Sequence, residues 1–352
     1  MKTYKAAIIG YGGMGNWHRK GICITPRIKI TGAFDILPEK EEAVTKDGLV
    51  WYPSQAALLA DPAVDIVIVA TPNNYHCEIV CAALEAGKAV VCEKPVAMDS
   101  AELQTMMDCA ARTGSLFTIH QNRRRDADFR AVRDAVESGG LGQVFAVESR
   151  VTGSRGIPHG WRRQLITGGG MMLDWGVHMI DQLMQLFPQK VVSVFCELYH
   201  VGYVECDDGF RLLIKFEGGP TCEVEVGTTH FIQPPRWRVY GDKGAITVND
   251  WNGSGKIVRA IETEEVWEEE IVYTKAGPTK TMAPRHEDTV SETEIDPDQY
   301  HSDHPGFYVN LAEVLDGAAE PFVRPEEAMR VMKVMEAAFE SDRTGQAVLG
   351  DI

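Results

Sequence analysis

Six residues near the start of the chain have types and a spacing that suit phosphate binding. A short apolar run, Ala6-Ala7-Ile8-Ile9, is followed at once by Gly10-Tyr11-Gly12-Gly13-Met14-Gly15. In a G-x-G-x-x-G turn between a strand and a helix, the first glycine allows the tight turn, the second lets the backbone approach a pyrophosphate, and the third lets helix and strand pack closely. The start of the helix also offers unpaired N–H groups and a positive dipole end to the phosphates. We therefore expect a dinucleotide to contact Gly10, Gly12, Gly13, Met14 and Gly15.

An acidic residue at the end of the next apolar run narrows the choice of dinucleotide. Asp35 lies twenty residues beyond Gly15, where a carboxylate accepts hydrogen bonds from the adenosine ribose and repels a 2′-phosphate. Neither Ile36 nor Leu37 supplies the arginine that would bind that phosphate. The sequence therefore favours NAD over NADP, and the alternative role for Asp35 is that of a simple turn cap. A third group, Thr71-Pro72-Asn73, follows an apolar run at 65–71, and we expect it at the same site because ligands of open α/β sheets bind outside the carboxyl ends of the strands. We interpret His76, on the following helix, as a surface residue.

A second candidate pair lies in the middle of the chain. Asp174 and His178 are four residues apart, so on a helix they share one face. Histidine has an unperturbed pKa suited to taking and returning a proton near neutral pH. Such a pair is also common as a surface or capping pair, and it can supply two metal ligands. Zinc would want a third protein ligand, for which only His159, His301 and His304 are conceivable, so we predict no metal.

The elements that must position these residues fall into two halves. In the first third, helical patterns such as 75–86 and 101–112 separate apolar runs at 5–9, 28–35, 65–71, 88–93 and 116–120. Such alternation is typical of βαβ units and of a parallel sheet buried on both faces. A chain of 352 residues is long enough for two domains of about 150 residues each. We therefore predict an α/β fold with a doubly wound, dinucleotide-binding Rossmann domain over residues 1–122.

After residue 122 the pattern changes. We expect helices at about 127–138 and 174–187, on either side of a strand at 143–151 and a glycine-rich stretch at 153–170. Long strand-like segments then follow one another without helices, at 191–201, 209–217, 221–230, 236–248 and 256–273. They predict an α+β domain over 123–352 with a large, open, mostly antiparallel sheet. We expect the polar, acidic tract 274–302 to be a long loop, and helices at about 305–317 and 325–342 to close the chain, the last packing back toward the first domain.

Composition limits the partners and the compartment. Lys and Arg number 35 against 51 Asp and Glu, so the net charge is -16. Such a surface repels nucleic acid and anionic membranes, and no run approaches the roughly 20 apolar residues of a membrane span. We expect no signal peptide, because the first strand begins at about residue 4. The eight cysteines are scattered without a CxxC pair, which favours reduced thiols in a cytoplasmic protein.

Three motifs together give the chain a family resemblance. With the glycine turn at 10–15, Glu93-Lys94-Pro95 at a strand end and the run from Gly168 to His178, GGGMMLDWGVH, the chain resembles the glucose-fructose oxidoreductase / inositol dehydrogenase / MocA (Gfo/Idh/MocA) family. The resemblance covers nearly the whole chain. It implies that Lys94, Asp174 and His178 form the catalytic group, with His178 as acid/base, Lys94 as its electrostatic and proton-sharing partner, and Asp174 as the residue that holds the substrate or orients the imidazole. It also implies cofactor contacts from Glu93, Lys94 and Asn122.

The remaining candidates are residues for the substrate. Asn122-Arg123-Arg124-Arg125 follows the last run of the first domain, where Arg123 is a candidate for a polyol or cofactor contact and Arg125 is expected to be solvated or paired. The segment 154–163, SRGIPHGWRR, has the composition of a binding loop. There Trp161 is expected to stack on a sugar face, and Arg155, His159 and Arg162 to bind hydroxyls. For Trp175, substrate contact and simple packing remain equal alternatives.

These observations and the resemblance together imply an NAD-dependent oxidoreductase acting on CH–OH groups. We expect oxidation of a secondary hydroxyl of a sugar, glycoside or cyclitol to a ketone, with C3 of a glucoside first and inositol 2-dehydrogenation next. Other readings are a glycosidase that retains NAD and oxidises C3 transiently, a dinucleotide sensor without chemistry, and an NADPH-dependent imine or biliverdin-type reductase. The resemblance also implies a homodimer or homotetramer formed through the large sheet, whose second face needs cover. We expect the tract 274–302 either to cover the pocket or to contact a neighbouring subunit, and the sequence leaves both alternatives open.

Overall fold

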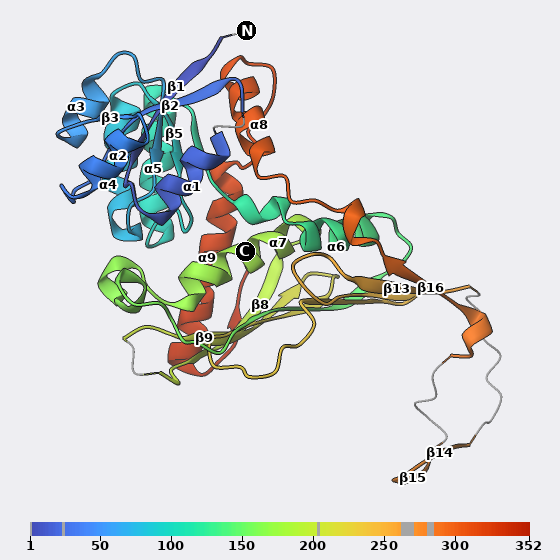
Figure 1. The fold of residues 1–352 in the computed structure, drawn as a ribbon. Helices are drawn as coiled ribbons and strands as arrows, with labels where there is room; N and C mark the ends of the chain where they lie inside the picture. The colour runs from blue at the N-terminus through green and yellow to red at the C-terminus, as the bar shows by residue number, and fades with distance from the viewer. Residues whose placement is uncertain (1, 23–24, 203–204, 262–270, 280–284) are drawn as a thin grey trace.

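The molecule is built around two sheets, which Figure 1 shows one above the other. The computed structural model describes residues 2–22, 25–202, 205–261, 271–279 and 285–352. One sheet has six strands and the other nine, and a hairpin of two further strands lies away from both (Figure 1). Among the described helices, none combines the length and the apolar composition that a membrane crossing requires.

The first sheet is parallel and doubly wound, in the strand order β3-β2-β1-β4-β5-β6. Its strands are β1 (Tyr4–Ile9), β2 (Ile28–Phe34), β3 (Val50–Trp51), β4 (Ile66–Val69), β5 (Ala89–Cys92) and β6 (Phe117–Ile119). The helices between them are α1 (Gly13–Ile22), α2 (Lys40–Lys46), α3 (Gln55–Ala60), α4 (His76–Glu85) and α5 (Ser100–Thr113). The predicted Rossmann architecture is confirmed.

Local sequence accounts for these elements. Every residue of β4 and β5 is buried, as expected of continuous apolar runs in a sheet covered on both faces. The carboxylate of Asp99 accepts a hydrogen bond from the N–H of Glu102 and so caps the start of α5. Gly114 ends the same helix with a left-handed φ of 66°.

The second sheet is mixed and mostly antiparallel, in the order β16-β13-β12-β11-β7-β10-β9-β8-β17. Its strands are β7 (Val144–Thr152), β8 (Val191–Tyr199), β9 (Gly209–Phe216), β10 (Thr221–Gly227), β11 (Trp237–Gly241), β12 (Gly244–Val248), β13 (Gly255–Ala260), β16 (Val290–Ile295) and β17 (Val348–Leu349). The hairpin apart from it is β14 (Val272–Thr274) and β15 (Gly277–Thr279), and the helices are α6 (Ala127–Glu137), α7 (Val177–Leu186), α8 (Pro305–Leu315) and α9 (Pro325–Thr344). Among the described strands of this second sheet, only β7 and β10 pair in parallel, so the predicted fold class is confirmed.

Three expectations in this half are wrong in detail. The single strand expected at 236–248 is the antiparallel hairpin of β11 and β12, whose turn lies inside an unbroken strand-like pattern. Of the strand expected at 256–273, β13 ends at Ala260 and β14 belongs to the separate hairpin, while 262–270 lie outside the described residues. The loop expected at 274–302 contains β15 and the edge strand β16. Because most of β16 is exposed, its sequence carries no apolar alternation.

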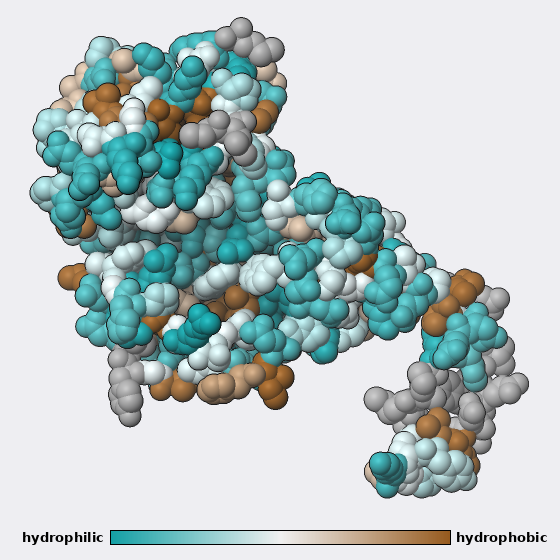
Figure 2. Space-filling model, in the orientation of Figure 1, coloured by the Kyte–Doolittle hydropathy of each residue, from teal (hydrophilic) through white to brown (hydrophobic). Residues whose placement is uncertain are grey.

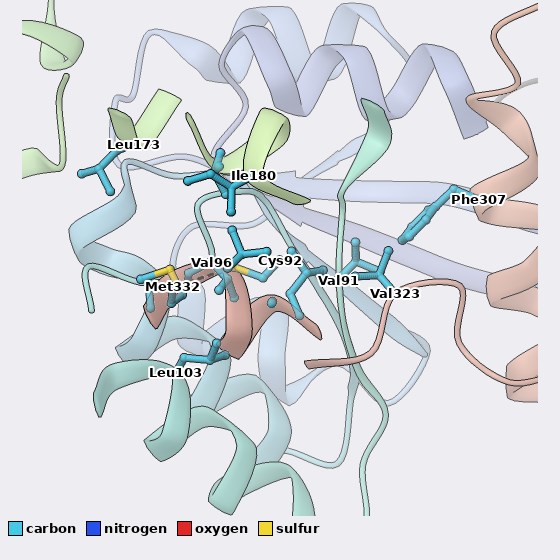
Figure 3. Close-up of a cluster of buried hydrophobic side chains, with 14 of the residues drawn as sticks. Val91, Cys92, Val96, Leu103, Leu173, Ile180, Phe307, Val323 and Met332 are labelled. Atoms are coloured by element: carbon cyan, nitrogen blue, oxygen red, sulfur yellow. Dashed lines mark hydrogen bonds between the residues drawn. The ribbon is translucent and has the colours of Figure 1, made fainter. Parts of the chain in front are cut away.

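One apolar core joins the two halves of the chain. In Figure 3, Val91 and Cys92 of β5 pack in the same cluster as Ile180 of α7 and Met332 of α9. Polar contacts follow the same junction, since the hydroxyl of Thr118 donates to the carbonyl of Val323 at 2.7 Å. The C-terminal helices therefore hold the end of the parallel sheet against the second domain.

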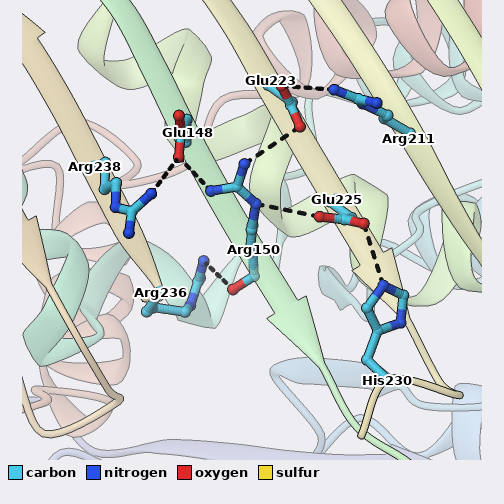
Figure 4. A network of polar contacts seen from close by, with 8 residues as sticks. All are labelled: Glu148, Arg150, Arg211, Glu223, Glu225, His230, Arg236 and Arg238. Atoms are coloured by element: carbon cyan, nitrogen blue, oxygen red, sulfur yellow. Dashed lines mark hydrogen bonds and ion pairs between the residues drawn. The ribbon is translucent and has the colours of Figure 1, made fainter. Parts of the chain in front are cut away.

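The outer face of the large sheet is charged. Figure 4 shows Arg150 of β7 between Glu148 on its own strand and Glu223 and Glu225 on β10. Arg211 and Arg238 pair with Glu223 and Glu148 at 3.2 and 3.5 Å. The surface in Figure 2 is likewise mostly hydrophilic, with hydrophobic residues in small groups. The outer face thus neutralises its own charges within one chain.

Candidate active site

A turn of π-helix, Met172–Gly176, places the central carboxylate of the site. The preceding glycines are required by close contacts: a Cβ on Gly169 would lie 2.5 Å from the carbonyl oxygen of Arg162, and one on Gly170 would lie 2.2 Å from Oδ1 of Asp207. Asp207 accepts a hydrogen bond from the N–H of Met172 at 2.7 Å. The helix expected at 174–187 therefore starts earlier and irregularly, which leaves Asp174 in the π turn and His178 in α7.

Lys94 and Asp174 meet across the junction of the two domains. The ammonium of Lys94 donates to Oδ1 of Asp174 at 3.0 Å and to its carbonyl oxygen at 2.9 Å. The other carboxylate oxygen accepts from Nε of Arg162 at 3.2 Å. Burial alone would raise the pKa of Asp174, but the charges of Lys94 and Arg162 hold it below its usual value. Asp174 is therefore an anion that fixes the lysine, and its two carboxylate oxygens contact Lys94 and Arg162.

His178 lies beside this pair as a neutral ring. Its residue surface is only 4% exposed, and its Nδ1 is buried without a hydrogen-bond partner in the described part of the chain. Burial, and then the charges of Lys94 and Arg123, lower the pKa of His178 well below its usual value. The imidazole is therefore unprotonated at neutral pH.

The glycine turn has the shape that a pyrophosphate requires. Gly10 has a φ of +96°, and a Cβ on Gly15 would lie 2.2 Å from the carbonyl oxygen of Gly10, so neither position tolerates a side chain. A Cβ on Gly12 or Gly13 would meet no atom within 4 Å, so space is open over the turn. Met14 lies half-buried in the first turn of α1.

Asp35 stands next to this turn. Its Oδ2 accepts from the N–H of Tyr11 at 2.7 Å and its Oδ1 from the N–H of Leu37 at 3.0 Å. The carboxylate therefore does cap the backbone, and the same bonds hold it where a ribose would lie beside the glycine turn. Both roles that the sequence left open fit this geometry.

Unpaired polar atoms mark the other end of the cofactor site. Thr71 Oγ1 and Asn122 Oδ1 are buried without partners among the described residues, and buried polar groups normally have one. They follow β4 and β6, whose carboxyl ends lie on either side of β5 and Lys94. Pro72 is half-buried beside them, and Asn73 is tied to the second domain by donating to the carbonyl of Gly168 at 2.8 Å. The residues present therefore fit a bound NAD.

Two polar residues lie deeper than the sequence suggests. His76 is fully buried and contacts the carbonyl oxygens of Pro95 and Thr71 at 3.0 Å each, so its interpretation as a surface residue is wrong. Helix periodicity alone did not reveal that its face turns toward the sheet. Glu93 is also buried, and its Oε1 lies 2.7 Å from ring nitrogens of both His18 and His120. The three side chains lie close enough to hold a metal, yet these distances are those of hydrogen bonds.

The substrate candidates divide between two hollows that share a wall of Val151, Thr152 and Trp175. One hollow, of about 370 Å³, contains Arg155. The other, of about 520 Å³, contains Arg123 together with Asp126 and Trp251, which the sequence did not single out. It also contains Ser302, at the end of the tract 274–302, and His304, which the sequence offered only as a conceivable metal ligand. Trp251 could have been noticed from the sequence, because it is an aromatic residue within the turn-like segment NDWNGS at 249–254.

The loop 154–163 is only partly at the site. Arg162 reaches Asp174, and its guanidinium lies 4.5 Å from the ring of Trp161. Trp161 is half-buried and His159 is exposed, and neither lines the two hollows. Arg125 pairs with Asp303, as expected.

Comparison with known proteins places both halves in one group. Residues 4–121 match the family described as "Oxidoreductase family, NAD-binding Rossmann fold", and residues 129–247 match the "GFO/IDH/MocA C-terminal domain". A crystal structure of an NAD-binding protein from Listeria innocua is 44% identical over 99% of this chain and 100% of that one, with a TM-score of 0.94. A scyllo-inositol 2-dehydrogenase (NADP(+)) of Bacillus subtilis is 26% identical over 99% of this chain and 96% of its own. A D-glucoside 3-dehydrogenase of Escherichia coli is 32% identical over 51% of this chain and 53% of its own.

Proposed function

The chain belongs to the GFO/IDH/MocA family of oxidoreductases, and from this premise we propose that it oxidises a secondary hydroxyl of a sugar or glycoside with NAD. The single observation that carries the proposal is the contact of Lys94 with Asp174 beside the neutral ring of His178. C3 of a glucoside is the proposed position, with the 2-position of an inositol as the alternative; relatives with both activities are similar to this chain.

The three residues divide the work of removing a proton. Bound NAD supplies the acceptor for the hydride that leaves the carbinol carbon. His178 accepts the hydroxyl proton, because its imidazole is neutral. Lys94 uses two of its three N–H groups on Asp174, and we propose that the third donates to the substrate oxygen, where it stabilises developing negative charge. Asp174 keeps that ammonium in place.

NADH formation across a panel of polyols tests the proposal. Inositols, free hexoses and methyl glucosides are each offered with NAD, and we expect the methyl glucosides to have the highest kcat/KM. A 3-keto sugar should appear in step with NADH. Absence of NADH with every compound would contradict the proposal, while release of glucose without NADH would identify a glycosidase that retains the cofactor.

Replacing Asp35 tests the cofactor preference. Asp35→Ala is expected to lower the ratio of kcat/KM with NAD to that with NADP by about tenfold or more, because it removes acceptors for the ribose hydroxyls and the charge that repels a 2′-phosphate. Asp108→Ala, which removes an exposed carboxylate on α5 of the same domain, is the control. A ratio unchanged by Asp35→Ala would leave the residue as a turn cap only.

We also propose a homodimer or homotetramer, joined through the outer face of the nine-stranded sheet, and a cytoplasmic location. Phe195 of β8, a hydrophobic side chain 39% exposed on that face, supports an interface there. The ion pairs in Figure 4 already neutralise the charges of the face, so its charges alone do not require a partner. The proposed location is supported by the described cysteines, all of which are free thiols. Native mass spectrometry should give a multiple of the 38.9 kDa chain, and Phe195→Asp should shift it to the monomer. A monomeric wild-type protein would refute the assembly.

A further inference from the structure

Trp251 is held rigidly at the edge of the larger hollow. It lies in the turn between β12 and β13, where Oδ1 of Asp250 accepts from the N–H of Asn252 at 2.8 Å and Oδ2 accepts from the hydroxyl of Ser254 at 2.6 Å. Gly253 completes the turn with a φ of +84°. The residue nevertheless keeps 42% of its surface exposed. A large aromatic side chain fixed in place and left open has the properties of a binding platform.

Two guanidinium groups and a second indole pack against the ring of Trp251. The guanidinium of Arg123 lies 4.9 Å from the Trp251 ring and that of Arg236 lies 4.6 Å from it. Trp175 contributes a ring 5.6 Å away at an angle of 44°, and Arg123 also lies 4.3 Å from it. These contacts fix the orientation of both indoles before any ligand arrives.

The charges around the platform cancel. Arg123 pairs with Asp126 at 2.8 Å, and Arg236 pairs with Asp128 at 3.2 Å. His304 lies 3.8 Å from Asp126 on the same wall. With both guanidinium groups already paired, the hollow presents no free cation for a phosphate or carboxylate among its described lining residues. It therefore suits a neutral ligand with an apolar face and several hydroxyls.

Lys94, Asp174 and His178 are not among the residues that line the hollow. Trp175, which lines the hollow, follows Asp174 directly, and its ring lies 6.1 Å from that of His178. Trp175 therefore connects the reacting groups to Trp251, whose ring lies 5.6 Å from its own. A ring that reacts at Lys94 and His178 would thus leave room of about 520 Å³ for a second group. One face of that group would meet Trp251, and its hydroxyls would meet Thr152, Ser302 and His304.

We propose that Trp251 forms a second subsite that binds the neutral sugar ring attached to the one being oxidised, which makes the enzyme selective for glucosides of another sugar over simple alkyl glucosides. The inference rests on the proposed function, and its test includes a measurement that does not require turnover.

Binding to the protein loaded with NADH gives the first arm of the experiment, since no oxidation can occur there. Calorimetry compares a β-linked glucose disaccharide with methyl β-glucoside. The wild-type protein should bind the disaccharide more tightly by about tenfold, the size of one aromatic contact. Trp251→Ala should abolish that difference while leaving the affinity for methyl glucoside unchanged, and Trp251→Phe should restore part of it.

Turnover gives the second arm, with Tyr273→Ala as the control because this exposed aromatic lies on the separate hairpin. The ratio of kcat/KM for disaccharide over methyl glucoside should fall about tenfold in Trp251→Ala and stay unchanged in Tyr273→Ala. Equal effects of Trp251→Ala on both sugars, or no preference in the wild type, would overturn the subsite. Preferential binding with no oxidation of either sugar would support the subsite and refute the proposed function.

Discussion

Lys94→Ala is expected to lower kcat by about 10²–10³-fold, the cost of losing one preorganised donor to a developing oxyanion. The residue is well placed for that role because two of its N–H groups are fixed by Asp174, at 2.9 and 3.0 Å. The side chain is only 12% exposed, so little water competes for the remaining N–H. Removal of the ammonium takes away one expected cofactor contact but leaves the Rossmann turn untouched, and NAD binding should therefore persist.

Two controls separate this effect from general damage. Lys215→Ala removes an exposed lysine on the large sheet and should leave kcat unchanged. Cofactor fluorescence of bound NADH should report a normal site in Lys94→Ala. If that variant binds the cofactor and keeps near-normal turnover, the role assigned to Lys94 is wrong.

His178→Gln is the second substitution with a large expected effect. Loss of the proton acceptor should lower kcat/KM by about 10²–10⁴-fold, the usual contribution of general base catalysis. Glutamine keeps a polar side chain of similar reach, so the packing around Trp175 should survive. Rates measured at several pH values give the clearest evidence, because only a titrating base imposes its own pKa on them.

The sign of that pH effect follows from the environment of the ring. The base must be unprotonated, and burial beside Lys94 and Arg123 holds the pKa of His178 well below its usual value of about 6.5. The acid limb of kcat/KM should therefore lie below the range of an ordinary histidine. Burial raises the pKa of Asp207, which caps the π turn, to about 6, so Asp207→Asn is needed to separate its titration. The acid limb of kcat/KM belongs to His178 if it persists in Asp207→Asn and disappears in His178→Gln. If that limb lies at or above pH 6.5, the environment assigned to His178 is wrong.

The parts of the fold that local sequence could predict are those in which burial and spacing agree. The apolar runs of β1, β4 and β5 are almost wholly buried, so their pattern was unambiguous, and the glycine turn was identifiable because close contacts forbid a side chain at Gly10 and Gly15. The edge strand β16 has mostly exposed residues and depends on pairing with β13, which no local pattern encodes. The burial of His76 likewise depends on how a helix meets its sheet.

The residues of the candidate site likewise divide into those that the sequence nominated and those that it missed. The family resemblance was enough to nominate Lys94 and Asp174, which the structure brings within 3.0 Å. It was not enough for Trp251, because Trp251 and Trp175 are brought together only by the large sheet. The four-residue spacing also predicted that Asp174 and His178 share one face of a regular helix. In the structure, Asp174 lies in the π turn Met172–Gly176, where its carboxylate contacts Lys94. Tertiary contact, rather than the chemistry of single residues, determined these positions.

Transfer of deuterium from the sugar to the cofactor tests the central claim most directly. Methyl glucoside labelled with deuterium at C3 is incubated with NAD and the wild-type protein, and the cofactor and the sugar are analysed by mass spectrometry. The proposed chemistry predicts that the label appears in the reduced cofactor in step with a 3-keto sugar, and that Lys94→Ala slows both together. Label retained on the sugar, with no reduced cofactor formed, would contradict the account.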